Sequence, residues 1–110
     1  MKASPKADRL SLHHIEDACE KILEYTVDGH EAFLEQSMIR DAVTRNFEII
    51  GEATKRLSAE TRTKNPQVEW KRVAGFRDIL IHGYDRVDVD EMWGVIEKDL
   101  PRLREEVHAI

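Results

Sequence analysis

The sequence predicts an all-α fold, an antiparallel bundle of about four main helices. Its 110 residues include only five glycines and three prolines, and 35% of them are charged. The chain has no alternating runs of Val, Ile and Thr long enough to indicate a sheet. Apolar residues instead recur at helical spacing between short polar connections, and short connections favour antiparallel neighbours.

The first predicted helix opens at Ser4-Pro5, because serine is a good N-cap and proline suits the first helical position. Asp28-Gly29 is a turn signal that ends it. Residues at helical spacing form its expected apolar side: Leu10, Ile15, Ala18, Ile22 and Tyr25.

A second long helix follows a short segment at residues 32–34. Ser37 is its expected N-cap, and the helix is expected to stop near Ser58. Its apolar stripe consists of Ile39, Val43, Phe47, Ile50, Thr54 and Leu57. Residues 58–66 are polar and end in Asn65-Pro66, so we expect a connector there and no core element.

The third predicted helix ends near Gly83, since glycine readily adopts the left-handed conformation of helix C-termini. Its stripe is Trp70, Val73, Phe76 and Leu80. Asp88 and Glu91 resemble a capping box that opens the fourth helix, and Pro101 should kink that helix. The fourth stripe is Met92, Val95, Ile96, Leu100, Leu103 and Val107.

Length and composition predict one domain, residues 1–110, in the cytoplasm. A chain this short supports a single modest core. Its one cysteine, Cys19, excludes an intrachain disulfide framework, fits a reducing compartment and has the spacing of a core thiol. The sequence contains no run of 18 apolar residues and no signal-peptide pattern, so we expect no membrane association.

The histidines do not suggest a metal site. They stand at positions 13, 14, 30, 82 and 108, and none lies four residues from another histidine or from Cys19. The sequence also lacks a glycine-rich phosphate loop and a serine-nucleophile motif. We therefore expect neither a metal nor a cofactor.

The segment RDILIHGY, residues 77–84, places a permanent cation, an imidazole and a phenol at a helix C-terminus. On an ideal helix His82 lies about 40° from Asp78, so this carboxylate can orient the ring and favour imidazolium. Arg77 and Tyr84 are nearly eclipsed. Spacing alone leaves a second interpretation open, namely an Asp-His surface pair with Tyr84 capping the helix.

The pattern Arg77-x4-His82-x-Tyr84 resembles the HepT toxins of the all-helical HEPN superfamily of ribonucleases. RNFEIIGEATKRLS at 45–58, PQVEWKRVAGFRDILIHGY at 66–84 and VIEKDLP at 95–101 are also similar to this family. The resemblance implies a HEPN-like two-fold homodimer. It also implies the toxin of a type VII (HepT/MntA) toxin-antitoxin system, a metal-independent endoribonuclease that cleaves RNA by 2′-hydroxyl attack.

The resemblance also implies roles for the motif residues. His82 would act as acid or base, Arg77 would stabilise the transition state, and Asp78 would have an auxiliary, orienting role. A cognate MntA-like nucleotidyltransferase antitoxin would neutralise the toxin by moving AMP from ATP onto Tyr84. The chain itself would need no cofactor, because the partner uses the ATP.

Two other classes of function remain open. The same motif would suit a non-catalytic HEPN subunit that binds phosphate within a nucleotidyltransferase complex, or a purely structural helical dimer. Asn46 and Glu52 interrupt an apolar run, and we expect structural roles for both.

The net charge of −5 argues against a protein that coats nucleic acids, but its distribution is uneven. Residues 1–36 carry −4, residues 37–86 carry +3 and residues 87–110 carry −4. Because the motif lies in the positive third, the acidic total is compatible with a local RNA site.

Overall fold

A computed structural model describes the backbone of residues 5–81 and 89–110, and the side chains of residues 5–76 and 89–110. Its elements, in chain order, are α1 (Pro5–Tyr25), α2 (His30–Glu35), α3 (Ser37–Arg56), α4 (Ala59–Lys64), α5 (Trp70–Ile81), α6 (Val89–Gly94), the π-helical turn η1 (Val95–Asp99) and α7 (Leu100–His108).

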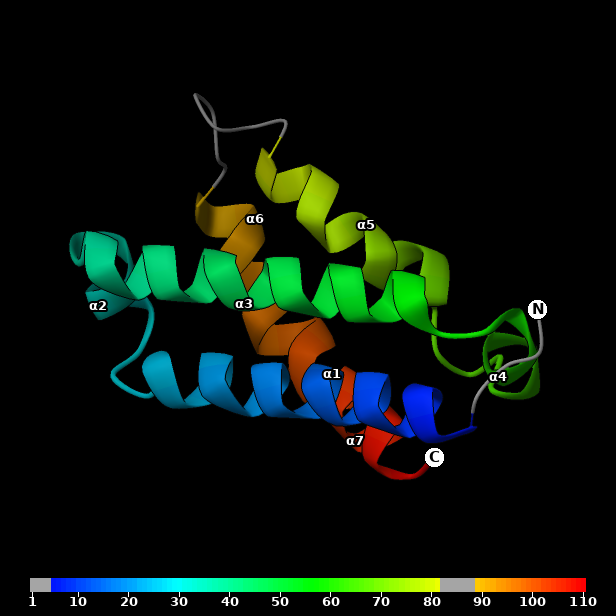
Figure 1. The fold of residues 1–110 in the computed structure, drawn as a ribbon. Helices are drawn as coiled ribbons and strands as arrows, with labels where there is room; N and C mark the ends of the chain where they lie inside the picture. The colour runs from blue at the N-terminus through cyan, green and yellow to red at the C-terminus, as the bar shows by residue number, and fades with distance from the viewer. Residues whose placement is uncertain (1–4, 82–88) are drawn as a thin grey trace.

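The long helices form an antiparallel bundle (Figure 1). α3 packs against α1 on one side and against α5 on the other, and the direction of the chain alternates from α1 to α3 to α5. The continuous run of α6, η1 and α7 crosses behind them, and α7 packs against α1. The predicted all-α bundle with four main helical segments is confirmed in the described part of the chain.

One apolar core lies between these helices. It is formed by Ile15, Ala18, Cys19, Ile22, Phe33, Val43, Phe47, Ile50, Ala53, Leu57, Val68, Trp70, Val73, Phe76, Met92, Ile96, Leu100, Leu103 and Val107. Most of the predicted stripes are in this list, because burial selects the residues that recur every three or four positions. Ile39 and Val95, both expected in the core, are only half-buried at its edge.

The buried side of α1 differs from the prediction at both ends. Leu10 and Tyr25, expected on the apolar side, are 57% and 39% exposed. Leu10 lies about 140° around the helix from Ile15, and Tyr25 is in the last turn, at the end of the element. The buried positions near the helix start are polar instead, namely Asp8 and Ser11.

A glycine stands at the start of α2, and an arginine of α3 joins the two helices. Gly29 precedes α2 with φ +95°, a conformation that L side chains rarely adopt. Arg40 Nη1 donates hydrogen bonds to the carbonyls of Phe33 at 3.1 Å and Leu34 at 2.6 Å. The expected Ser37 cap is wrong, because Gln36 is the N-cap and makes no side-chain capping bond.

The polar connector after α3 contains the short helix α4, which the sequence analysis did not predict. Ser58 is its N-cap, and the Thr61 backbone N–H donates to Ser58 Oγ at 3.1 Å. Asp8 of α1 accepts hydrogen bonds from the Ser58 backbone N–H, Ser58 Oγ and Thr61 Oγ1 at 3.0, 2.6 and 2.6 Å. A buried carboxylate therefore fastens α4 to α1.

Loss of this carboxylate should destabilise the protein at neutral pH. We expect Asp8→Ala to lower the free energy of unfolding by about 2–3 kcal/mol, because it removes three hydrogen bonds to a charged acceptor. The hydroxyl donors lower the pKa of Asp8 below its ordinary 3.8. The charged carboxylate therefore stabilises the fold above about pH 4, and this contribution disappears as the pH falls through the lowered pKa.

Urea denaturation of Asp8→Ala and the unmodified protein at pH 7 and pH 2.5 measures this effect. The two proteins should differ less in their free energy of unfolding at pH 2.5 than at pH 7. The matched control is Asp17→Ala, which breaks an exposed pair with Lys21 and should change stability by about 0.5 kcal/mol or less. If Asp8→Ala lowers the free energy of unfolding by the same amount at both pH values, the charge of Asp8 does not contribute to stability.

The C-terminal run is helical throughout but irregular at η1. The Leu100 N–H donates to the Val95 carbonyl, five residues back, just before Pro101. Proline has no N–H and its ring crowds the carbonyl four residues earlier, so an α-helical pattern cannot continue through it. The sequence predicts a kink at Pro101, and the structure has this π-helical turn just before the proline.

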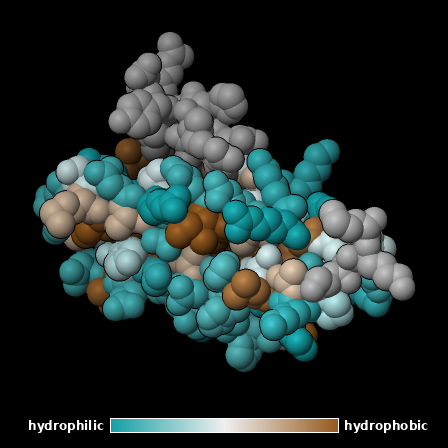
Figure 2. Space-filling model, in the orientation of Figure 1, coloured by the Kyte–Doolittle hydropathy of each residue, from teal (hydrophilic) through white to brown (hydrophobic). Residues whose placement is uncertain are grey.

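The face in Figure 2 is mostly hydrophilic. Large exposed apolar side chains are scattered along α1 and around the α2 region, and Val27 and Met38 are the most exposed at 79% and 82%. No helix within the described ranges is long and apolar enough to cross a bilayer.

Candidate active site

The candidate motif begins on α5, which is anchored to the bundle at several points. Trp70 Nε1 donates to the Asn65 carbonyl at 2.9 Å at the start of the helix. Phe76 meets the Phe47 ring of α3 edge-on, with centroids 5.7 Å apart. Arg72 Nη2 lies 3.0 Å from Asp99 Oδ2 of η1. These contacts hold α5 against α3 and η1, and Arg77 and Asp78 follow on the same helix.

The structure describes the motif only in part. The backbone of Arg77 and Asp78 is helical and lies in the last two turns of α5, and their side chains lie outside the described residues. His82, Gly83, Tyr84 and Asp88 also lie outside, as does Ser4. The spacing argument that brings Asp78 to His82 therefore stays a prediction.

An aromatic cluster that the sequence analysis missed joins α2 to α6. His30 stacks on Trp93 with centroids 4.9 Å apart and planes 14° apart, and Phe33 lies 5.4 Å from the same Trp93 ring. His30 Nε2 is 3.5 Å from Asp90 Oδ1, and Trp93 Nε1 donates to Glu97 Oε2 at 3.3 Å. This cluster fixes the start of the helical run that follows the motif.

The contacts and burial of the other residues considered for chemistry, Cys19, Asn46 and Glu52, indicate structural roles. Cys19 is fully buried, and burial raises the pKa of its thiol to about 12, so it is a core residue and not a nucleophile. Asn46 is buried and donates from Nδ2 to the Ala42 carbonyl at 2.9 Å, which confirms its structural role. Glu52 is half-buried in a groove between α1 and α3.

The other histidines do not converge on one site. His13 and His14 are both exposed on α1, as expected of a solvated pair. His108 Nδ1 pairs with Glu16 Oε1 at 2.7 Å, between α7 and α1. In the part of the chain that the structure describes, no three His, Cys, Asp or Glu side chains gather as metal ligands would.

The fold and the motif helix define a class of protein, a small helical bundle whose arginine-bearing motif helix is packed onto its central helix. A family model described as "Ribonuclease HepT-like" matches residues 15–110. The chain belongs to the HepT-like ribonuclease family.

Relatives of similar length agree with this assignment. A "probable ribonuclease HepT" of Thermococcus cleftensis is 38% identical over 94 residues, which cover 84% of this chain and 86% of that protein. A "putative RNase" of Caldanaerobacter subterraneus subsp. tengcongensis is 41% identical over 107 residues, with 96% and 95% covered.

A longer relative carries a second named activity. A "gamma-glutamylcyclotransferase and putative RNase" of Methanocaldococcus jannaschii is 45% identical over 103 residues, which cover 93% of this chain and 46% of that protein. This chain thus spans about half the length of that relative. No solved structure matches.

Proposed function

We propose that this chain is the toxin of a type VII toxin-antitoxin pair and that it cleaves RNA internally without a metal ion. The observation that carries the proposal is the family match over residues 15–110, a range that includes the sequence motif Arg77-x4-His82-x-Tyr84. The anchoring of α5 supports it for Arg77, because a catalytic group on a packed helix is better positioned than one on a loop.

The proposed reaction is an attack of the RNA 2′-oxygen on the adjacent phosphorus. A base removes the 2′-hydroxyl proton, the P–O5′ bond breaks, and an acid protonates the leaving 5′-oxygen. The products are a 2′,3′-cyclic phosphate and a 5′-hydroxyl. An imidazole such as His82 can take either role near neutral pH, and Arg77 stabilises the charge on the phosphorane-like transition state.

One imidazole cannot act as base and acid in the same step. A two-fold homodimer that brings two motifs together would supply the second His82 and a second Arg77. Asp78 acts as a positioning residue in this proposal, because its carboxylate would hold the His82 ring. The protein would act in the cytoplasm, where cellular RNA is its substrate.

Neutralisation would proceed by transfer of AMP to Tyr84. The phenol oxygen attacks the α-phosphorus of ATP held by the cognate nucleotidyltransferase, and pyrophosphate leaves. The adenylate phosphate would then compete with RNA for the cations of Arg77 and His82.

Growth of cells that express this chain alone tests the proposal. We expect induction to arrest growth, and His82→Ala to abolish the arrest while the protein accumulates to the same level. If cells that express the chain without any substitution grow normally, the result would instead support a non-catalytic subunit of a nucleotidyltransferase complex.

Mass spectrometry tests the modification. Incubation with the cognate nucleotidyltransferase and ATP should add mass in steps of one AMP, and Tyr84→Phe should remove the addition. Peptide mapping that finds AMP elsewhere, or nowhere, would contradict a role for Tyr84.

A further inference from the structure

A groove between α4 and α5 lies at the opposite end of α5 from the motif. It is lined by Ala59, Arg62, Thr63, Trp70, Lys71 and Ala74. Both cations are exposed, and no carboxylate lines the groove. The alanines and the largely buried Trp70 are the apolar part of its lining, so an extended chain can approach without meeting a bulky exposed apolar side chain.

The charge of this groove is not neutralised by the protein. Neither Arg62 nor Lys71 forms an ion pair with a described carboxylate. Five cations elsewhere are paired within 4 Å, namely Lys21, Arg45, Lys64, Arg72 and Arg102, whereas Lys98 and Arg104, like the groove cations, are in no ion pair with a described carboxylate. The groove between α1 and α3 also contains cations, but Asp17 and Glu52 line it as well. The α4–α5 groove, which has no carboxylate in its lining, therefore attracts anions more strongly than the α1–α3 groove does.

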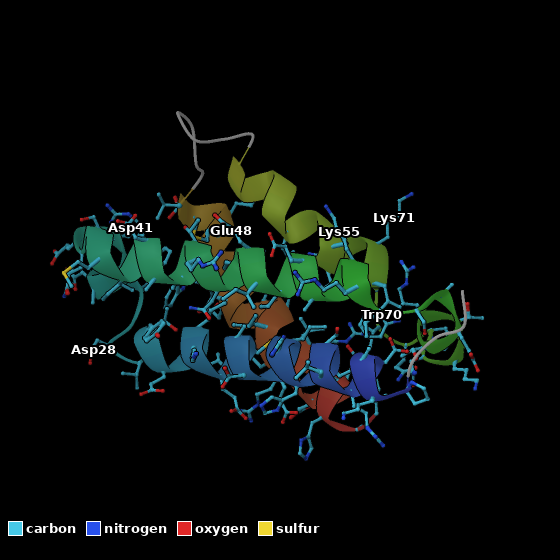
Figure 3. All side chains as sticks on the ribbon, in the orientation of Figure 1. Asp28, Asp41, Glu48, Lys55, Trp70 and Lys71 are labelled. Carbon is cyan, nitrogen blue, oxygen red and sulfur yellow. The ribbon has the colours of Figure 1, made fainter. Side chains whose placement is uncertain are left out.

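Two residues of the groove, Lys71 and Ala74, share one face of α5 with Asp78 of the motif. Lys71, Ala74 and Asp78 lie within about 60° of each other around the helix, and Arg77 is about 9 Å of helical rise and about 120° around the helix from Lys71. Figure 3 shows Lys55 and Lys71 projecting on the side of the molecule away from α1.

We propose that the α4–α5 groove binds the phosphodiester backbone of single-stranded RNA at a distance from the bond that is cleaved. This inference rests on the proposed ribonuclease function and adds a second point of contact for the same substrate. Phosphates are the anions that unpaired Lys and Arg side chains bind with release of counterions. Since Arg62 and Lys71 would contact phosphates, which are the same at every nucleotide, binding there should not depend on sequence.

Binding of a fluorescein-labelled 20-mer of uridine in EDTA tests the groove directly. All proteins carry His82→Ala, so the RNA stays intact. Adding Arg62→Gln and Lys71→Gln should weaken binding roughly tenfold at low salt and reduce the slope of log K against log salt by about 1.4, since two phosphate contacts are lost. The matched control adds Lys98→Gln and Arg104→Gln, exposed cations of η1 and α7 outside the groove.

Cleavage assays separate this inference from the proposed function. A dinucleotide has one phosphate, which must occupy the reaction site, so it cannot reach the groove. With His82 intact, Arg62→Gln/Lys71→Gln should cleave a dinucleotide as fast as the unmodified protein and cleave the 20-mer about tenfold more slowly. If no protein cleaves either RNA, the proposed ribonuclease reaction fails, and the binding assay still tests the groove.

Two results would overturn the groove proposal. One is equal affinity and equal salt slope for the groove variant and its control. The other is an intact affinity for RNA together with a lost complex with the nucleotidyltransferase, which would assign the groove to a protein partner.

Discussion

Replacing His82 with alanine is expected to slow RNA cleavage by about 10³-fold in the presence of EDTA. A positioned acid or base contributes roughly 10²–10⁴-fold to a proton-transfer step, and in a dimer the substitution removes both imidazoles. Arg77→Ala should cost about 10²–10³-fold, the effect of losing one charge-stabilising group at a transition state. Initial rates on a labelled RNA, with equal concentrations of folded protein, measure both effects.

The chain offers controls of the same residue types. His14 is an exposed histidine of α1 and Arg56 an exposed arginine in the last turn of α3. Alanine at either position should leave the rate within about twofold, because neither belongs to the motif. Full activity of His82→Ala or Arg77→Ala would refute the assignment of catalysis to these residues.

Phe47→Ala is expected to lower the free energy of unfolding by about 3–5 kcal/mol, the usual cost of removing a buried aromatic ring. Phe47 is 1% exposed at the centre of α3 and packs edge-on against Phe76 of α5. The substitution leaves a cavity directly beneath the motif helix, so cleavage activity should fall as well.

Urea denaturation at pH 7 measures the stability effect. Phe47→Leu should cost less, because leucine refills part of the space. Leu34→Ala is the control, since Leu34 is 43% exposed. A loss below about 1 kcal/mol for Phe47→Ala would show that the core relaxes around the missing ring.

Helix order and core positions could be predicted because they depend on local periodicity. The spacing of Ile15, Ala18 and Ile22 indicated the buried face of α1. The predictions are wrong at positions whose burial depends on contacts with residues far away in the chain. Asp8 takes a buried place on α1 because its partners, Ser58 and Thr61, lie some 50 residues away in the chain.

The motif could be found from sequence because Arg77, His82 and Tyr84 lie within eight residues of one another. The α4–α5 groove could not, since Arg62 and Lys71 are on different helices and the path of the connector between them is set by packing. The stacking of His30 on Trp93 joins α2 to α6, and because the two residues are 63 positions apart in the sequence, no local pattern predicts it.

The most direct test of metal-independent cleavage is the chemistry of the RNA ends produced by the unmodified protein in EDTA. We expect cleavage to persist and to leave a 2′,3′-cyclic phosphate and a 5′-hydroxyl, as attack by the 2′-oxygen requires. Cleavage that stops in EDTA, returns with Mg²⁺ and leaves a 3′-hydroxyl and a 5′-phosphate would contradict it.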